Sequence, residues 1–430
     1  MAHLPTQPYR GTRDFLPEEM SVRAQIFDTL FKAVETYGFQ RYHGPTLEAA
    51  AIYEAKSGEE LANQQLYRLT DKGGRDLALR PEMTPTVARM IAGNAGKVQL
   101  PARWYSHVAC FRYERPQRGR VREHFQLNVD LFGSDSFEAE VEIFEVVAAI
   151  MKALGAPREL YELRVNDRVL IEGALLHHVG VPEDKLIEAS LVIDRWEKVD
   201  ADKRAATMAE LGLSAEQQAK LGELLTMDLD AYREAAGPEH AERSSLAQIL
   251  SGGMTTAPVV FDPGIVRGLA YYTGTVFEVF DVSPDNRRSI FGGGRYDNLV
   301  GLFSNQQISG IGFGMGDVTT WNFLETHGLL PEVDIAPEVY LWATDSNYRG
   351  SLRELVGSLR DADVRAVPAL GETSMKAGLK QASRMGARFA VALSEHEMAE
   401  GRVLVKDLSS GEQHTPTLGE ALQALLAARG

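Results

Sequence analysis

The stretch FRYERPQRGRVREHFQLNVDLFG (residues 111–133) contains a run that alternates strictly between polar and apolar residues. One face of this run carries Phe125, Leu127, Val129 and Leu131, and the other carries His124, Gln126, Asn128 and Asp130. A period of two is typical of an antiparallel strand with one core face and one wet or ligand-facing side. The sequence therefore predicts two strands, 103–114 and 121–133, joined by an Arg/Gly/Pro turn.

This hairpin is rich in arginine and contains no lysine. Its six arginines are Arg103, Arg112, Arg115, Arg118, Arg120 and Arg122. The planar arginine side chain binds phosphate and carboxylate groups at two points, so the hairpin suits an anionic ligand such as a nucleotide or a nucleic acid. A solvated hairpin whose arginines only maintain solubility explains the cluster equally well.

The neighbouring segments extend this sheet. A helical period over residues 18–37 ends at Gly38, and Thr84 followed by Pro85 is a helix start signal with Thr84 as the cap. Strand-like runs follow at 258–262, 269–281 and 310–316, with the glycine triplet 292–294 between them, where glycine permits close backbone approach. Asp317 is interpreted as the N-cap of the next helix. Between the two groups of strands, residues 170–255 predict a helical insertion.

Length and composition restrict the class of protein. The 430 residues predict two or three domains: residues 1–326 interrupted by the insertion, a linker at 327–337, and an α/β domain at 338–430 with a largely parallel sheet. No apolar run reaches the roughly 18 residues that a membrane span needs, and no secretory signal is recognised, so we expect a cytoplasmic protein. The net charge of −15 argues against nonspecific binding to DNA.

Few residues suggest chemistry by themselves. Glu82 precedes the predicted helix start, where it either projects into a pocket or favours the helix dipole. Arg267 precedes two tyrosines and, if buried, needs an anionic partner. The glycine triplet lacks the Lys-Ser/Thr ending of a P-loop, and residues 312–316 lack the spacing of a dinucleotide fingerprint. Cys110, the single cysteine, lacks the spacing of a zinc site and is interpreted as a small buried hydrophobe.

Taken together, these segments resemble the class II aminoacyl-tRNA synthetases, and among them the histidine–tRNA ligase family. The resemblance covers nearly the whole chain and keeps the order of the family's motifs. The matching segments are GTRDFLP (11–17), GFQRYHGPTLE (38–48), LRPEMTPTVAR (79–89), residues 111–133, RGLAYYTGTVFE (267–278) and GGGRYDNLV (292–300).

The resemblance implies an α+β catalytic domain, in which helices flank an antiparallel sheet, with the helical insertion and a C-terminal α/β anticodon-binding domain. It implies ATP-dependent activation of L-histidine and transfer to tRNA(His), with ATP and Mg²⁺ as cofactors and no protein-held metal site. The segment around Pro45 resembles the motif that builds the family's dimer interface, so a homodimer is expected.

The resemblance also implies roles for individual residues at matching positions. For histidine, these are Glu82, Thr84 and Gln126 at the α-amino group, Asp130, Tyr272 and Tyr271 near the imidazole, and Met83 within the same segment. For ATP, they are Arg112 and Arg267 at the α-phosphate, as the catalytic pair, with Glu114, Arg120 and His124 along the nucleotide. Arg115 and Arg118 are implied contacts of the tRNA acceptor end. On the C-terminal domain, the basic stripe of Lys376, Lys380 and Arg384 reads the anticodon or is a solvated helix face.

Three positions depart from the family pattern. Thr319 stands where the third motif has an ATP-binding arginine, and Arg287 or Arg288 is a candidate for that missing charge. Ala270 replaces a common aspartate, and the usual Phe-His order is reversed at His124-Phe125, where the histidine ring is still able to stack on adenine.

Two other functions compete with the ligase. The first is the histidine-binding regulatory subunit of ATP phosphoribosyltransferase, which has the same fold, charges no tRNA and would account for Thr319. It lacks the C-terminal α/β domain that an anticodon reader needs. The second is a nucleic-acid-binding adaptor without chemistry, which does not explain a set of polar groups suited to a small amino acid.

Overall fold

The chain forms two compact units, Met1–Pro331 and Glu332–Gly430. The computed structural model describes residues 3–55, 65–196, 199–251, 254–267, 271–286 and 288–428. Arg287 and Ala270, both singled out in the sequence, lie outside the described residues. Within the described ranges, no helix combines the length and the apolar character that crossing a bilayer requires.

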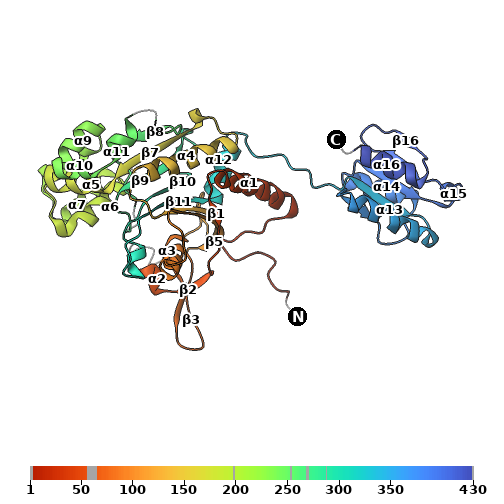
Figure 1. Cartoon of the computed structure of the whole chain (residues 1–430), viewed down its shortest axis with the longest axis horizontal. Helices are drawn as coiled ribbons and strands as arrows, with labels where there is room; N and C mark the ends of the chain where they lie inside the picture. Colours follow the sequence, from red (N-terminus) through yellow and green to blue (C-terminus); the bar gives the residue numbers. More distant parts are fainter. Residues whose placement is uncertain are drawn as a thin grey trace. The chain divides into compact units, whose positions relative to one another are not determined.

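A large sheet is the centre of the first unit (Figure 1). The predicted hairpin is confirmed, with Ala102 opposite Phe132 at one end and Phe111 opposite Glu123 at the other. Neighbouring strands are antiparallel except at the two edges, where β1 pairs with β5 and β7 with β8 in parallel. In spatial order the strands are β1 (Gln40–Arg41), β5 (Ala102–Phe111), β6 (Glu123–Phe132), β11 (Gly310–Gly316), β10 (Phe291–Arg295), β9 (Thr275–Asp281), β7 (Tyr161–Asp167) and β8 (Val259–Phe261).

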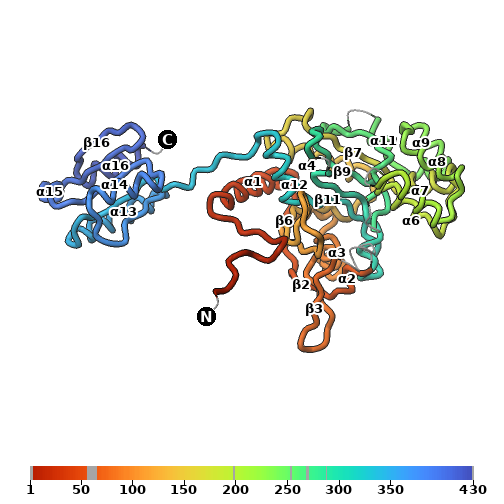
Figure 2. The backbone as a smooth tube through the Cα atoms, turned by 180° about the vertical axis from the view of Figure 1, so that it is seen from behind, coloured from red at the N-terminus to blue at the C-terminus, as the bar shows by residue number. Residues whose placement is uncertain are grey.

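One face of this sheet packs against helices α1 (Pro17–Glu35), α4 (Glu138–Ala153) and α12 (Asp317–Thr326), as Figure 2 shows from behind. Leu127 and Val129 of β6 are fully buried there, in one apolar cluster with Leu30 of α1 and Phe144 of α4. The apolar face that the alternation predicted is therefore the core face, and α1 matches the predicted helix within two residues.

The opposite face, predicted to be wet or ligand-facing, is also covered, so it is not wet at Asn128 and Asp130. Asn128 and Asp130 are 1% and 0% exposed. Helix α3 (Thr84–Asn94) packs on this side, and its N-cap is Met83, one residue before the predicted Thr84. The cover also includes α2 (Ala51–Glu54) and a small sheet in the order β2 (Leu47–Ala49), β4 (Asp76–Leu79) and β3 (Tyr67–Thr70).

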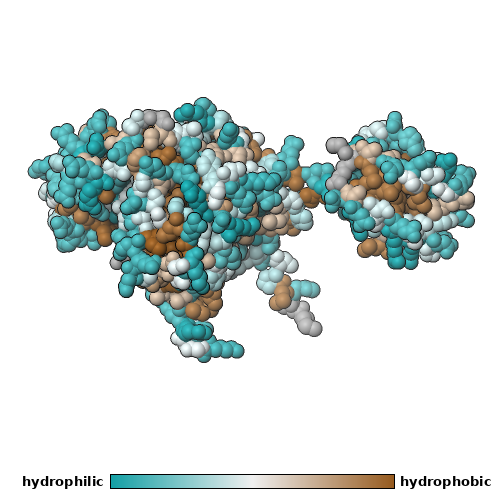
Figure 3. Space-filling model, in the orientation of Figure 1, coloured by the Kyte–Doolittle hydropathy of each residue, from teal (hydrophilic) through white to brown (hydrophobic). Residues whose placement is uncertain are grey.

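The β3–β4 hairpin projects from this unit, and Figure 3 shows hydrophilic side chains at its tip. There, Arg75 Nε lies 2.6 Å from Asp71 Oδ2, so an ion pair closes the turn.

A helical region occupies the stretch where the insertion was predicted. Its α-helices are α5 (Arg168–Ala174), α6 (Leu186–Asp194), α7 (Ala201–Glu210), α8 (Ala215–Leu224), α9 (Leu229–Ala236), α10 (Pro238–Arg243) and α11 (Leu246–Leu250).

The second unit is an α/β sheet with helices on both faces. The predicted parallel pairing holds for β13, β12 and β14, but β15 and β16 are antiparallel because short connections join them. Helices α13 and α16 pack on one face and α14 on the other. The elements are β12 (Val339–Ala343), α13 (Arg349–Asp361), β13 (Ala366–Pro368), α14 (Met375–Arg384), β14 (Phe389–Leu393), α15 (Glu395–Met398), β15 (Leu404–Asp407), β16 (Gln413–His414) and α16 (Leu418–Ala427).

Candidate active site

Glycines of β10 lie beneath the candidate site. The sequence placed the triplet 292–294 between strands, but these residues are the middle of β10. A Cβ atom on Gly292 would lie 2.1 Å from Arg267 Nη1, and one on Gly294 would lie 2.8 Å from Tyr272 Cδ1. The prediction that other atoms approach this backbone closely is therefore correct. The atoms that do so belong to the side chains of Arg267 and Tyr272, which lie flat on the strand.

Strand β11 repeats this arrangement under the polar face of β6. A Cβ atom on Gly312 would lie 2.6 Å from Asp130 Oδ1, and one on Gly314 would lie 1.9 Å from Gln126 Nε2. No residue larger than glycine fits either position without displacing these side chains. We call these four glycines the glycine floor: Gly292, Gly294, Gly312 and Gly314.

Asp130 is a buried carboxyl group on this floor. Tyr296 donates a hydrogen bond to its Oδ1 atom, whereas Oδ2 has no hydrogen-bond partner among the described residues. The Tyr42 hydroxyl, which is close enough to feel the Asp130 charge, is also buried without a partner. Burial raises the pKa of Asp130 to about 7, although the hydrogen bond from Tyr296 acts in the opposite direction. A buried acceptor with a vacant hydrogen-bonding position suits a polar ligand.

Glu82 belongs to the same group of buried side chains. Tyr271 donates a hydrogen bond of 2.8 Å to Glu82 Oε2, and the rings of Tyr271 and Tyr296 are in edge contact at 5.9 Å. Glu82 is 4% exposed, so its carboxylate lies inside the protein, as the pocket interpretation predicted. Thr84 is buried beside it, and Met83 packs in an apolar cluster with Val108 and Cys110.

Arg267 has the anionic partner that its burial requires. Its Nη1 atom lies 3.0 Å from Glu278 Oε1 on β9, and its guanidinium group lies 5.8 Å from the centre of the Tyr272 ring. Arg267 also has a positive φ of 53°, which is uncommon for a residue with a Cβ atom. This backbone conformation, held next to a polar cluster, is typical of a functional site.

Gln126 connects the buried cluster to the arginine hairpin. Cys110 Sγ donates to Gln126 Oε1 at 3.4 Å, which orients the amide. Burial raises the pKa of the Cys110 thiol to about 12, so it is protonated at neutral pH. The interpretation of Cys110 as a small buried residue is confirmed.

The residues expected along ATP lie in the turn of this hairpin and at the beginning of β6. Arg112 Nε donates to the Pro81 carbonyl at 3.0 Å, which places the guanidinium group beside the segment that carries Glu82. Arg120 Nε lies 3.4 Å from Glu114 Oε2. Burial, reinforced by the charge of Arg112, lowers the pKa of His124 to about 3, so its ring is neutral at physiological pH.

The hairpin arginines differ in their contacts. Arg103 pairs with Glu142 at 3.2 Å, and the Arg122 guanidinium lies over the ring of Tyr113. Arg115 and Arg118 are exposed and have no hydrogen bond or ion pair within the described part of the chain. The solubility interpretation therefore does not apply to the whole cluster, because half-buried members contact fixed groups.

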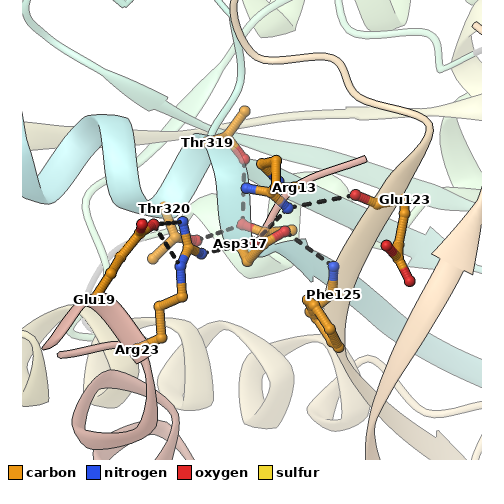
Figure 4. Close-up of polar contacts among 9 residues, drawn as sticks. Arg13, Glu19, Arg23, Glu123, Phe125, Asp317, Thr319 and Thr320 are labelled. Carbon is orange, nitrogen blue, oxygen red and sulfur yellow. Dashed lines mark hydrogen bonds and ion pairs between the residues drawn. The ribbon is translucent and has the colours of Figure 1, made fainter. Parts of the chain in front are cut away.

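Asp317 joins distant segments and is not the predicted N-cap. Gly316 is the N-cap of α12 and no side chain caps the helix. The carboxylate instead binds Arg13 Nη2 and Arg23 Nη1, each at 2.9 Å, and accepts the Phe125 backbone N–H at 2.9 Å (Figure 4). Glu19, one helical turn before Arg23, holds its guanidinium at 2.8 Å.

The sequence did not assign the partner residues of this site. Tyr296 is the second residue after the glycine triplet, so its place after the GGGR run was the available signal. Glu278 lies in the family segment that also carries Arg267, and the need for a counter-ion pointed to such a residue. No local pattern indicated Tyr42 as a site residue, and none indicated the partners of Asp317.

The chain as a whole matches a known group of enzymes. A histidyl-tRNA synthetase family profile matches residues 11–317, and an anticodon-binding domain profile matches residues 338–428. The histidine–tRNA ligase of Leptospira biflexa is 38% identical over 426 residues, 98% of each chain. That of Thermoplasma volcanium is 36% identical over 422 residues, 97% of each chain.

Solved structures agree at the level of the fold. The histidyl-tRNA synthetase of Nostoc sp. PCC 7120 superposes with a TM-score of 0.78 at 22% identity, covering 99% of this chain and 100% of that chain. A Bacillus halodurans structure described as an ATP phosphoribosyltransferase regulatory subunit/histidyl-tRNA synthetase gives 0.71 at 22% identity, covering 91% and 98%. The full-length relatives and the two matching profiles establish that this chain belongs to the histidyl-tRNA synthetase family of class II aminoacyl-tRNA synthetases.

Proposed function

We propose that this protein activates L-histidine with ATP and transfers it to tRNA(His). The observation that carries the proposal is the buried Asp130 carboxyl group, whose Oδ2 atom has no partner in the described structure and lies in one cluster with Tyr296, Tyr271 and Glu82. A site that hydrogen-bonds its substrate rejects analogues that lack the matching group. An imidazole N–H is such a group.

In this proposal the amino acid lies across the glycine floor. Asp130 accepts the hydrogen bond from the imidazole, with Tyr272 and Tyr271 beside the ring. Glu82, Thr84 and Gln126 bind the α-amino group, and Met83 packs beneath them. The alternating glycines support these assignments, because they allow Asp130 and Gln126 to lie flat on β11.

Activation is assigned to two arginines on opposite sides of the site. The histidine carboxylate attacks the α-phosphorus of ATP, the bond to the β-phosphate oxygen breaks, and pyrophosphate leaves. Arg112 and Arg267 offset the charge on the nonbridging oxygens, with Glu114, Arg120 and His124 along the nucleotide. Glu278 supports this role because it fixes Arg267 at 3.0 Å before any ligand binds.

Mg²⁺ is the metal that this chemistry implies, and it supplies charge neutralisation on the departing phosphates when bound. The described residues contain no group of three or more His, Cys, Asp or Glu side chains that could hold a metal alone. Nucleotide-bound Mg²⁺ needs only one or two protein carboxylates. Glu114 fits that requirement: its Oε2 atom accepts no hydrogen bond, although it lies 3.4 Å from Arg120 Nε.

The remaining assignments concern macromolecular partners. Arg115 and Arg118, exposed and without ion pairs in the described chain, would contact phosphates of the tRNA acceptor end. Lys376, Lys380 and Arg384 form an exposed basic stripe on α14 of the anticodon-binding unit. We also propose a homodimer, which sedimentation analysis of the full chain would test.

Histidine-dependent exchange of labelled pyrophosphate into ATP tests the activation step. We expect exchange with histidine and none with other amino acids. Arg267→Ala should reduce exchange by orders of magnitude while histidine binding is retained, because its interaction with the phosphate forms mainly in the transition state. Absence of exchange in the unaltered protein, with histidine bound, would refute activation. The regulatory-subunit alternative is not favoured, because the curated full-length relatives are histidine–tRNA ligases and the anticodon-binding domain is present.

A further inference from the structure

A cavity next to the arginine hairpin is lined by two arginines, Arg118 and Arg288, and by one carboxylate, Asp285, and no ligand has been assigned to Arg288 above. Its volume is about 310 Å³, and Arg118, Gly119, Arg288 and Thr319 line it. Arg288 belongs to the β9–β10 connection and has no hydrogen bond or ion pair within the described part of the chain. A concave site with cations on two sides is suited to a polyanion.

Arg288 and Thr319 flank the same residue of the hairpin. A Cβ atom on Gly119 would lie 3.4 Å from Arg288 Cδ and 3.9 Å from Thr319 Cγ2. Gly119 has a positive φ of 77°, and the backbone of Gln117 and Arg120 closes the turn around it. The arginine of the β9–β10 connection and the threonine of α12 therefore face one point on the cavity wall.

Thr319 also holds the connection that carries Arg288. Its hydroxyl donates a hydrogen bond to the carbonyl oxygen of Ile290, two residues after Arg288. A second anchor lies before Arg288, where Asn286 Nδ2 donates to Thr326 Oγ1 at 3.0 Å and to Asp281 Oδ2 at 2.7 Å. Contacts to α12 therefore hold the connection at Asn286 and at Ile290, on either side of Arg288.

The charges around Arg288 disfavour the empty cavity. Burial and the positive charge of Arg120 both lower the pKa of Arg288 below its ordinary value. The negative charge of Glu114 acts in the opposite direction but does not offset them. Arginine nevertheless remains protonated in proteins, so the repulsion persists until an anion enters. Phosphate groups placed between these arginines relieve it.

We propose that Arg288 binds the β- and γ-phosphates of ATP and takes over the task of the arginine that Thr319 replaces. The inference rests on the proposed function, since it assigns a residue to the leaving pyrophosphate of that reaction. In this proposal the arginine belongs to the β9–β10 connection and not to helix α12. Thr319 is a positioning residue, because its hydrogen bond to the Ile290 carbonyl holds that connection.

Calorimetric titration of the full chain with ATP and with AMP tests this assignment without requiring catalysis. Arg288→Ala should weaken ATP binding roughly 10- to 100-fold, as expected when a charged hydrogen-bond partner is lost. AMP affinity should be unchanged, since AMP lacks both phosphates. Arg288→Lys should recover part of the loss. Equal losses for ATP and AMP, or ATP binding that is unaffected by Arg288→Ala, would overturn the proposal.

A second-site variant and a matched control sharpen the experiment. Thr319→Arg introduced together with Arg288→Ala should restore ATP affinity, because both positions face Gly119 across the same cavity. Arg158→Ala removes an exposed arginine of the same unit far along the sequence and should leave ATP binding unchanged. If the unaltered protein shows no pyrophosphate exchange but the ATP-selective loss occurs, the proposed function fails while the phosphate site stands.

Discussion

The buried carboxyl of Asp130 predicts an unusual pH dependence of stability. Its pKa rises from 3.8 to about 7 on folding, so the native state keeps a proton that the unfolded chain releases. Stability from this group is therefore fully present below pH 3.8 and is lost as the pH rises towards 7, because the native state binds more protons over that range. The separation of the two pKa values corresponds to at most about 4 kcal/mol.

Asp130→Asn removes this titration and keeps the shape of the side chain. We expect the stability of the variant, relative to the unaltered protein, to increase by up to about 4 kcal/mol between pH 4 and pH 8. Differential scanning calorimetry across this range measures the change. The transition of the C-terminal unit provides an internal reference, because Asp130 lies in the other unit.

The comparison of Asp130→Asn with the unaltered protein isolates the titration of Asp130. Burial also raises the pKa of Asp167 to about 6, but this contribution is common to both proteins and cancels in their difference. A stability difference that stays constant from pH 4 to pH 8 would show that Asp130 is ionised in the native state, and the argument from burial would be refuted.

Three further predictions concern histidine binding, the ion pairs of Asp317 and the reactivity of Cys110. Gly314→Ala should abolish tight histidine binding in calorimetry, because the new Cβ atom meets the Gln126 amide at 1.9 Å, whereas Gly93→Ala, with nothing within 4 Å in α3, should leave binding intact. Asp317→Ala should lower the free energy of unfolding of the first unit by about 3–5 kcal/mol in denaturant titrations, since the buried Arg23 and the half-buried Arg13 lose their carboxylate. Glu19→Ala, which removes a more exposed partner of Arg23, should change it far less, and equal effects would contradict the central role of Asp317. Cys110 should resist iodoacetamide at pH 8 in the native protein and react on unfolding, because its thiol is buried with a pKa of about 12; rapid native labelling would disprove this.

The local part of the fold was predictable from sequence, and the reason is periodicity. The alternation from His124 to Leu131 gave the strand and its core face correctly, and the apolar repeat of α1 gave the helix. Alternation reports which side chains face the core but not what covers the other side. Asn128 and Asp130 are buried on the side where α3 packs with Tyr271, Tyr272 and Tyr296, which come from distant sequence.

Two wrong predictions, for β10 and for Asp317, also show that a local sequence pattern does not report contacts with distant segments. Strand β10 was missed because glycine has low strand propensity, and this strand exists through close packing with its neighbours. Asp317 looked like a cap because caps are local, yet its partners Arg13 and Arg23 lie about three hundred positions earlier. The residues of the candidate site came from resemblance to a family, whereas their contacts, such as Tyr296 with Asp130, needed the structure.

The glycine floor also limits how the specificity of this enzyme can be redesigned. The four glycines lie directly beneath the side chains of Arg267, Tyr272, Asp130 and Gln126, so any larger residue at these positions displaces those side chains. Libraries that aim at another amino acid should therefore keep the floor constant and vary the surrounding tyrosines, Tyr42, Tyr271 and Tyr296. A successful variant would accept a substrate of different polarity more readily than one that extends deeper into the protein.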